Sequence, residues 1–517
     1  MRPSLSSHAR RDPVSTTVVA AVVAVVVTVA LVASIVLVTG PSESPATSGD
    51  PLVVETTGGL ARGIEQDGVR TWRGLPYAAP PVDDLRWRAP QPAAEWDDVR
   101  DASRFGASCF QAGAYEYGDA VVAARPRSSE DCLYLNVTQP AAAPAAAGLP
   151  VIVWLHGGGL IQGSGSTVDP TALAARGAVI VTINHRLGRL GYFAHPALEQ
   201  DVANLGLLDQ VEALEWVRDN AARFGGDPDL VTVMGGSAGA ISVNALMVAP
   251  AADGLFARAI SQSATGDRAA RTLDDVRRQG ARDFPGLSAD ELRALPASAL
   301  LSSTFNVLLG DAPIIDEVLP ESVGEAFARG HEAAVPYLVG TTDAEFSDGD
   351  YRAAGTDPAR LRSQLGGTGH DALVAAYGRR AFRKHALNDL VFQAPAVALA
   401  LHHADRAPTF RYRFAADRDG SGHGTDVPYV FGQEELPIRK ALARAMGDYW
   451  VAFARLGEPR VGGRPGWPSA SGSSYLDLGA GGPKPVARDP WTSRLAALNA
   501  AVPLRLPASG FSAARDR

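Results

Sequence analysis

Short apolar runs that end at glycine indicate buried β-strands in the first half of the chain. Val151–Leu155 is apolar throughout and stops at the glycine-rich segment His156–Gly159. A second run, Val231–Met234, is rich in β-branched residues and leads into two glycines. The small residues from 238 to 243 suit a helix that packs tightly on a sheet, and Pro250 is expected to end this helix. The pattern therefore predicts strands that alternate with helices.

The longest apolar segment lies near the N-terminus and predicts a membrane-spanning helix. From Val18 to Val38 the only polar residues are Thr28 and Ser34. At 1.5 Å per residue, a helix of about 20 residues crosses a hydrocarbon core of about 30 Å. The apolar core of a signal peptide is shorter, about 7–15 residues, which favours a retained anchor over a cleaved signal.

Basic residues set the expected orientation of this helix. Arg2, Arg10 and Arg11 precede it, so the positive-inside rule places residues 1–17 in the cytoplasm. Residues 39–50 are rich in Pro and Ser and are expected to form a flexible linker. Residues 51–517 are then one extracytoplasmic domain, anchored to the cell membrane, or secreted if the segment 18–38 is cleaved.

A serine follows the second apolar run in the sequence Gly235-Gly236-Ser237-Ala238-Gly239, the GxSxG pattern of a nucleophile elbow. Glycines two before and two after the serine permit the close backbone approach of a sharp strand-to-helix turn, which exposes the serine Oγ. In a chain with 53 glycines this pattern also arises by chance, so it needs chemical partners.

A candidate oxyanion hole lies upstream, where His156 is followed by three glycines, Gly157–Gly159. Glycines let backbone N–H groups turn inward. Acyl transfer needs such preplaced donors for the tetrahedral oxyanion, each worth about 3 kcal/mol. A flexible loop is the alternative interpretation, but a position after a buried strand and before the elbow favours the oxyanion hole.

The chain resembles the type B carboxylesterase family, the cholinesterase-like branch of the α/β-hydrolases. Besides the two motifs above, the resembling segments are Gly74–Ala78, Ser129–Val137, Asn184–Gly188, Asn204–Gln210, Phe224–Pro228, Ser261–Ser263 and Gly457–Pro459. The resemblance implies an α/β-hydrolase fold, with a central, mostly parallel sheet flanked by helices and long loop insertions that form a gorge. It also implies hydrolysis of small-molecule carboxylic esters without a cofactor.

The catalytic base is sought among the histidines that follow Ser237, because the chain order in α/β-hydrolases is Ser, then the acid, then His. The histidines that meet this condition are His331, His370, His385, His402, His403 and His423. The pair at 402 and 403 lies within an Ala/Leu-rich helical pattern. His423 lies in a glycine-rich turn after the alternating run Phe410–Phe414, from which a ring can reach the elbow. Because Gly422–Tyr429 also resembles the family's histidine motif, His423 is the predicted base.

Two carboxylates are candidates for the acid. Val335–Gly340 predicts a strand, and Asp343 and Glu345 lie just beyond its end, where α/β proteins collect catalytic groups. Both are chemically able. The resemblance selects Glu345, with Asp343 as the alternative, although Phe346 departs from the Gly or Trp often found next in the family.

The resulting hypothesis is a serine hydrolase that works through an acyl-enzyme. His423 takes the proton of Ser237, Ser237 attacks the ester carbonyl, and Glu345 orients and stabilises the imidazolium. The oxyanion is expected to be held by three backbone amides, those of Gly158, Gly159 and Ala238.

The two cysteines, Cys109 and Cys132, are expected to form a disulfide. They lie 23 positions apart in a domain that should face an oxidising compartment. Their flanking residues also resemble the family's first disulfide loop. Two buried free thiols are the alternative.

Departures from the cholinesterases argue against choline esters. Cholinesterases carry a glutamate just before the nucleophile, whereas this chain has Gly236, and its cysteine loop contains Tyr115 and Tyr117 but no Trp. A quaternary ammonium needs an aromatic face and nearby negative charge. Uncharged esters are therefore expected. The polar segment 266–268 leaves the acyl pocket undefined, while the pairs Arg186 with Asp209 and Arg86 with Glu130 resemble structural ion pairs of the family.

Composition excludes some functions and leaves others open. With 48 Lys+Arg against 56 Asp+Glu, the net charge of -8 gives no electrostatic case for nucleic acid. The absence of CxxC and HExxH motifs argues against a metal. A carbamate or amide hydrolase, and a catalytically silent cholinesterase-like surface binding domain, remain alternatives to the esterase.

Overall fold

The computed structural model describes most of the chain from residue 49 onward. The described residues are 49–112, 128–144, 146–265, 271–301, 312–346, 358–417, 420–433, 438–470 and 472–501. Their folded unit begins at Leu52, and within it no helix has the length and apolar character to cross a bilayer. The expected anchor at residues 18–38 lies outside the described residues.

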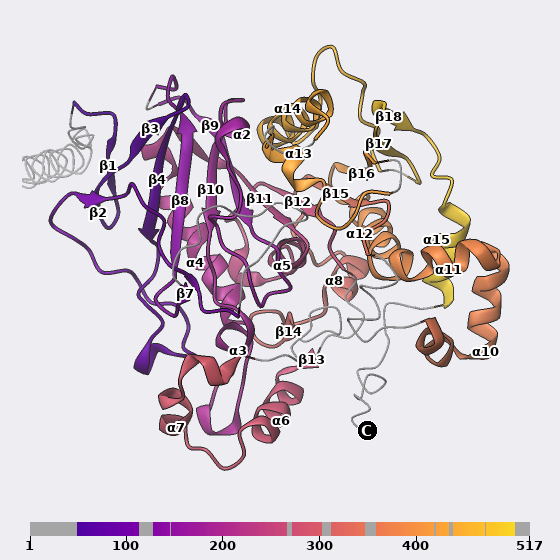
Figure 1. The fold of residues 1–517 in the computed structure, drawn as a ribbon, viewed down its shortest axis with the longest axis horizontal. Coiled ribbons are helices and arrows are strands. Elements are labelled where there is room, and N and C mark those ends of the chain that lie inside the picture. Colours follow the sequence, from indigo (N-terminus) through magenta and orange to yellow (C-terminus); the bar gives the residue numbers. More distant parts are fainter. Residues whose placement is uncertain are drawn as a thin grey trace, which may run out of the picture. The chain divides into compact units, whose positions relative to one another are not determined.

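The described residues contain one large mixed sheet of eleven strands, which Figure 1 shows at the centre of the fold. In spatial order the strands are β18 (Gly482–Val486), β17 (Tyr475–Gly479), β16 (Thr409–Ala415), β15 (Tyr337–Thr342), β12 (Arg258–Gln262), β11 (Gly226–Gly236), β9 (Leu149–Leu155), β10 (Val179–Ile183), β8 (Tyr134–Pro140), β4 (Val69–Pro76) and β3 (Ile64–Gln66). The strands from β17 to β10 are parallel, and antiparallel strands are added at both edges. Parallel strands need covered faces on both sides.

Strand β9 shows how the sequence places the two cores. Successive side chains of a strand point to opposite faces. Val151, Val153 and Leu155 enter the core on one face of the sheet, whereas Ile152 and Trp154 enter the core on the other. The continuous apolar run in the sequence therefore indicates a strand that is buried on both faces.

Helices cover both faces of the sheet. The helices of the described residues are α2 (Thr171–Ala174), α3 (Gly188–Gly191), α4 (Leu205–Asn220), α5 (Ala238–Leu246), α6 (Leu273–Asp283), α7 (Ala289–Ala294), α8 (Val323–Arg329), α10 (Pro358–Tyr377), α11 (Arg379–Asn388), α12 (Ala394–His403), α13 (Val427–Phe431), α14 (Lys440–Leu456) and α15 (Thr492–Ala501). The core on one face takes side chains from α4, α5, α8 and α12, and the core on the other takes them from α2, α13 and α14. These layers can be followed in Figure 1.

Two helical groups extend beyond the sheet. Helices α10, α11 and α15 pack with the π-helical turn η7 (Asp389–Gln393) around their own apolar cluster, at one end of the fold in Figure 1. Helices α6 and α7 form the second group. The short 3₁₀ turns of the described residues are η1 (Asp83–Leu85), η2 (Pro196–Leu198), η3 (Ala221–Phe224), η4 (Pro250–Ala252) and η5 (Ala297–Leu300).

Three small sheets complete the part of the fold that the structure describes. Their strands are β1 (Val53–Thr56), β2 (Gly59–Arg62) and β5 (Arg100–Asp101); β6 (Ser108–Cys109) and β7 (Ser128–Ser129); and β13 (Arg271–Thr272) and β14 (Ile314–Ile315).

The architecture matches the predicted mostly parallel sheet flanked by helices, with differences at element ends. The helix after the elbow stops at Leu246, and Pro250 begins the separate turn η4. The regular helix therefore ends four residues before the expected position, and Ala249, the residue directly before the proline, is already extended with φ -73° and ψ 118°. The expected gorge walls include segments 113–127 and 266–270, which lie outside the described residues.

Candidate active site

Ser237 occupies the sharp turn between β11 and α5. Its backbone has φ 56° and ψ -121°, a conformation that a non-glycine residue adopts only when its surroundings hold it there. The backbone N–H of Ser237 donates to Gln262 O at 2.8 Å, which ties the turn to the end of β12. This is the strained geometry of a nucleophile elbow.

The elbow glycines are required by close packing. A Cβ on Gly235 would lie 2.4 Å from the backbone of Gly239, and a Cβ on Gly239 would lie 2.0 Å from Leu155 O. Neither contact is possible for a larger residue. The start of α5 is therefore pressed against the end of β9, where the loop Gly157–Gly159 begins.

The glycine loop adopts conformations that favour glycine. Gly158 has φ 108° and Gly159 has φ 64°, and a Cβ on Gly158 would lie 2.1 Å from Gln162 O. Ala238 is the first residue of α5, so its N–H belongs to the unpaired end of the helix. The predicted amide donors, Gly158, Gly159 and Ala238, thus lie on two segments that meet beside Ser237.

His423 connects the elbow to a carboxylate. Ser237 Oγ lies 2.6 Å from His423 Nε2, and Glu345 Oε2 lies 2.6 Å from His423 Nδ1. Among the six candidate histidines, His423 is the one whose ring is bonded to Ser237. The others lie elsewhere: His331 contacts Glu321, His370 contacts Asp371, His385 lies near Trp491, His402 is exposed at the end of α12, and His403 is buried against Glu332.

Glu345 is fully buried and fixed by the backbone. Its Oε1 accepts from Thr342 N at 2.8 Å, and its own carbonyl accepts from His423 N at 2.7 Å. The side chain has no exposed surface. The carboxylate is therefore oriented toward the imidazole before any substrate arrives.

Asp343 contacts the backbone of the histidine loop and not the His423 ring. Its Oδ1 accepts from Ser421 N at 2.7 Å, so it supports the loop that carries His423 rather than the ring. Burial raises the pKa of Asp343 above its ordinary value. Of the two carboxylates, Glu345 is the one bonded to the histidine.

Two phenylalanines surround the His423 ring. Phe346 and Phe392 have ring centroids 4.6 and 5.1 Å from that of His423. Phe392 and Gln393 belong to the π-helical turn η7, and Gln393 Nε2 donates to Thr342 O at 2.6 Å. In the sequence, Phe346 is visible only as a departure from the family pattern, and the η7 residues carry no motif from which their place could be predicted.

Asp426 is a second buried carboxylate near the histidine. Its Oδ2 accepts from Tyr412 OH at 2.6 Å and from Gln262 Nε2 at 3.1 Å. Burial is the main reason that the pKa of Asp426 is raised, and the nearby Glu345 raises it further. The sequence feature that could have identified Asp426 is its position three residues after His423, within the segment Gly422–Tyr429 that resembles the family's histidine motif.

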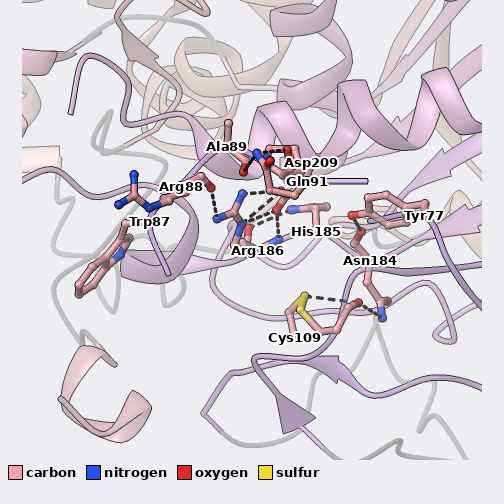
Figure 2. Close-up of polar contacts among 12 residues, drawn as sticks. Tyr77, Trp87, Arg88, Ala89, Gln91, Cys109, Asn184, His185, Arg186 and Asp209 are labelled. Atoms are coloured by element: carbon pink, nitrogen blue, oxygen red, sulfur yellow. Dashed lines mark hydrogen bonds and ion pairs between the residues drawn. A yellow bond between two sulfur atoms is a disulfide. The ribbon is translucent and has the colours of Figure 1, made fainter. Parts of the chain in front are cut away.

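The predicted structural ion pairs are present in the scaffold. Arg186 and Asp209 lie 2.6 Å apart, fully buried, and Figure 2 shows the Arg186 guanidinium between Asp209 and the carbonyl of Arg88. Arg86 and Glu130 form a two-pronged pair at 2.5 and 2.8 Å.

Two buried histidines stack behind the glycine loop. The rings of His156 and His185 lie 4.6 Å apart and nearly parallel. Burial, with the neighbouring His185, lowers the pKa of His156 to about 3, and burial lowers the pKa of His185 to about 4. Both rings are neutral near pH 7 and act as packing groups.

Cys109 and Cys132 are joined by a disulfide with an S–S distance of 2.01 Å. The loop residues Tyr115 and Tyr117 lie outside the described residues. In the part of the chain that the structure describes, no group of three or more His, Cys, Asp or Glu side chains could hold a metal ion.

A mainly apolar cavity of about 440 Å³ lies beside the glycine loop. Its wall includes Ile161 and Gln162, two and three residues after Gly159. Arg189 is the only charged residue among the described residues that line it. Its apolar walls come from Phe110, Leu187, Leu190, Leu300 and Leu301.

The chain is similar to known carboxylesterases over most of its length. Residues 50–356 and 376–488 match the model of the carboxylesterase family. The para-nitrobenzyl esterase of Bacillus subtilis (strain 168) is 36% identical over 455 residues, which cover 79% of this chain and 90% of that protein. The fumonisin B1 esterase of Sphingopyxis macrogoltabida is 36% identical, with 82% of this chain and 85% of that protein covered.

A vertebrate relative and a solved structure match a similar share of the chain at similar identity. Liver carboxylesterase 1 of Oryctolagus cuniculus is 32% identical, with 83% of this chain and 90% of that protein covered. A structure of PNB esterase superposes with a TM-score of 0.74 at 33% identity, and covers 87% of this chain and 100% of its own. The similarity therefore spans most of the folded unit.

Proposed function

The chain belongs to the carboxylesterase family and is a carboxylic ester hydrolase, and on this premise we propose that it cleaves esters through a covalent acyl-enzyme on Ser237. The observation that carries the proposal is the 2.6 Å distance from Ser237 Oγ to His423 Nε2. A serine hydroxyl is a weak nucleophile until a base within hydrogen-bonding distance takes its proton.

The first half-reaction forms the acyl-enzyme. Ser237 Oγ attacks the ester carbonyl carbon, its proton passes to His423 Nε2, and the carbonyl oxygen becomes an oxyanion. The oxyanion accepts hydrogen bonds from the amides of Gly158, Gly159 and Ala238. The tetrahedral intermediate then collapses, and the departing alcohol oxygen takes the proton from His423.

The second half-reaction restores the enzyme. Water attacks the acyl carbon while His423 takes one of its protons, and the new tetrahedral intermediate releases the carboxylic acid and returns the proton to Ser237 Oγ. Glu345 accepts a hydrogen bond from His423 Nδ1 throughout, which fixes the tautomer and stabilises the imidazolium.

Of the two rival functions, carbamate or amide hydrolysis is compatible with the same geometry. A carbamate or amide substrate would use the same nucleophile, base and oxyanion donors. A catalytically silent surface binding domain would not need a hydrogen-bonded serine, histidine and glutamate, and their occurrence together favours the enzyme.

A substrate series with active-site labelling tests the proposal. The full chain is assayed with nitrophenyl esters of graded acyl length, matched nitroanilides and carbamates, and a fluorophosphonate whose adduct is located by mass spectrometry. We expect fast ester turnover and an adduct on Ser237. Turnover of amides or carbamates above that of esters would favour the first rival, and the absence of both turnover and adduct would favour the second.

We further propose that the preferred substrates are uncharged esters and that part of the substrate occupies the 440 Å³ cavity. The described residues of its wall include no carboxylate that could attract a cation. Gly236 supplies no charge beside Ser237 either. A relative named para-nitrobenzyl esterase is consistent with a neutral alcohol group.

For the cellular location, we propose an extracytoplasmic domain anchored by residues 18–38, with residues 1–17 in the cytoplasm and residues 39–50 as a linker to the catalytic domain at 51–517. The proposal is supported by the apolar segment, by the basic residues before it and by a disulfide, which persists in oxidising compartments. Two experiments test this location. Fractionation should recover the esterase with the membranes, and protease added to intact cells should digest its catalytic domain. Recovery of all the esterase in the cytosol would contradict it.

A further inference from the structure

The segment directly after the glycine loop is held by an unusual side-chain contact. Gln111 Nε2 donates to Gly163 O at 2.8 Å, and Gly163 N donates to Gln111 Oε1 at 2.8 Å. One side-chain amide thus pairs with both backbone groups of a single residue. Gln111 also donates to Cys109 O at 2.9 Å, so the contact is anchored to the disulfide.

A second amide supports the same segment from another element. Asn184 Oδ1 accepts from Gly165 N at 2.8 Å and from Ser164 Oγ at 3.0 Å. Its Nδ2 donates to Cys132 O at 3.2 Å. Figure 2 shows Asn184 beside the disulfide. Residues 163–165 are therefore connected to the carbonyls of both cysteines.

Gly163 packs directly on the glycine loop. It has φ 117°, and a Cβ at this position would lie 2.3 Å from His156 Nδ1 and 2.5 Å from Gly157 O. Gly163 therefore lies close against His156 and Gly157, and a shift of Gly163 toward the loop would displace them. The hydrogen bonds from Gln111 to Gly163 therefore also help to hold the start of the loop in place.

The same turn sets the direction of an oxyanion donor. Gly158 O accepts from Ile161 N and from Gln162 N, both at 3.1 Å. In a trans peptide unit the C=O and the following N–H point in opposite directions. The carbonyl of Gly158 is thus turned toward residues 161 and 162, and the N–H of Gly159 is turned away from them. Gln162 is the neighbour of Gly163, so Gln111 holds the far end of this turn.

From these contacts we infer that Gln111 is a positioning residue for the oxyanion hole, acting through Gly163. The inference rests on the proposed serine esterase mechanism. Oxyanion donors act because they are aligned before charge develops, and loss of one donor costs about 10²–10³ in kcat. Loss of the Gln111 side chain would leave the oxyanion donors in the chain but align them less well. The expected decrease in kcat is therefore smaller, about tenfold or more.

Two variants and a matched control test the inference. Gln111→Met keeps the length of the side chain and removes both hydrogen bonds to Gly163. Gln111→Glu keeps an acceptor for Gly163 N and places a carboxylate oxygen against the carbonyls of Gly163 and Cys109. Gln91→Met is the control, because Gln91 is exposed and, among the described residues, its side chain donates to the neighbouring carbonyls of Ala89 and Pro90.

The measurements are kcat and KM for a short-chain nitrophenyl ester, the inhibition constant of a trifluoromethyl ketone, and thermal unfolding. The ketone forms a serine adduct with an oxyanion and mimics the transition state. For both Gln111 variants we expect kcat to fall about tenfold or more, with KM changed by less than about threefold, and ketone binding to weaken in parallel. The control should match the unsubstituted chain.

The outcomes separate this inference from the proposed mechanism. Unchanged kcat and ketone binding in Gln111→Met would overturn it, as would a loss confined to KM. If neither Gln111 variant folds, the role is structural and the inference is wrong. If the unsubstituted chain is not labelled at Ser237, the proposed mechanism itself fails.

Discussion

Glu345 and Asp343 are two residues apart in the chain, yet their carboxylates serve different partners. Glu345 Oε2 lies 2.6 Å from His423 Nδ1, whereas Asp343 Oδ1 accepts from the backbone N–H of Ser421 at 2.7 Å. One orients the imidazole and the other holds the loop that carries it. The first prediction follows from this division.

Glu345→Gln should lower kcat by about 10³–10⁴, because an amide no longer stabilises the imidazolium or fixes its tautomer. Asp343→Asn should cost less than about tenfold, since the amide oxygen still accepts from Ser421 N. The measurement is kcat for a nitrophenyl ester. The reverse order of effects would move the acid to Asp343.

Ser237→Ala should abolish ester hydrolysis and fluorophosphonate labelling while circular dichroism and thermal unfolding stay unchanged. His423→Ala should lower kcat by about 10⁴ or more, because no other base lies within reach of Ser237 Oγ among the described side chains. His402→Ala is the control and should change kcat by less than about twofold, since this side chain is exposed at the end of α12. Labelling that persists in Ser237→Ala would refute the nucleophile assignment.

Removal of the disulfide should lower the free energy of unfolding. Cys109 and Cys132 close a loop with a sequence separation of 23, and loop closure of this size contributes about 3 kcal/mol. Equilibrium urea unfolding of the double variant Cys109→Ala, Cys132→Ala measures the loss. Thiol counting on the denatured, unreduced chain is the check, and detection of two free thiols would contradict the pairing.

For substrates of equal acyl length, kcat/KM of a nitrophenyl ester should exceed that of a thiocholine ester by at least about tenfold. Each desolvated cation–π contact is worth about 2 kcal/mol or more, and a tenfold preference corresponds to about 1.4 kcal/mol. The apolar cavity offers no carboxylate among its described lining residues. A better thiocholine substrate would show that a cation site is built from other residues.

The stacked histidines predict a loss of stability in acid. Burial lowers the pKa of His185 to about 4, while an unfolded histidine titrates near 6.5. The unfolded chain therefore binds the extra proton first. The stabilising contribution is complete above pH of about 6.5 and is lost as the pH falls toward 4. His156 acts in the same direction, with its pKa lowered to about 3.

The variant His185→Phe isolates this effect, because it retains a ring against His156 but cannot titrate. Urea unfolding between about pH 6 and pH 4.5 gives the slope of the free energy of unfolding against pH. The slope should be smaller in the variant by up to about 1.4 kcal/mol per pH unit, the value for one proton. Equal slopes would show that His185 does not bind a proton on unfolding.

Parts of the site whose geometry depends on a few consecutive residues could be predicted from the sequence alone. The elbow was predictable because glycine is required at 235 and 239, where a Cβ would lie 2.4 and 2.0 Å from neighbouring backbone atoms. The loop Gly157–Gly159 was readable because its positive φ angles favour glycine. Strand β9 was readable because a strand buried on both faces is continuously apolar.

Contacts between side chains that are distant in the sequence could be found only from the folded chain. Phe392 and Gln393 reach His423 and Thr342 from a π-helical turn, and Gln111 reaches Gly163 across 52 positions of sequence. An amide or a phenylalanine has no local pattern that reveals its partner, because such a contact depends on how whole elements pack. The sequence left the choice between Asp343 and Glu345 to a resemblance, since two carboxylates on one loop differ only in the direction that the folded backbone gives them.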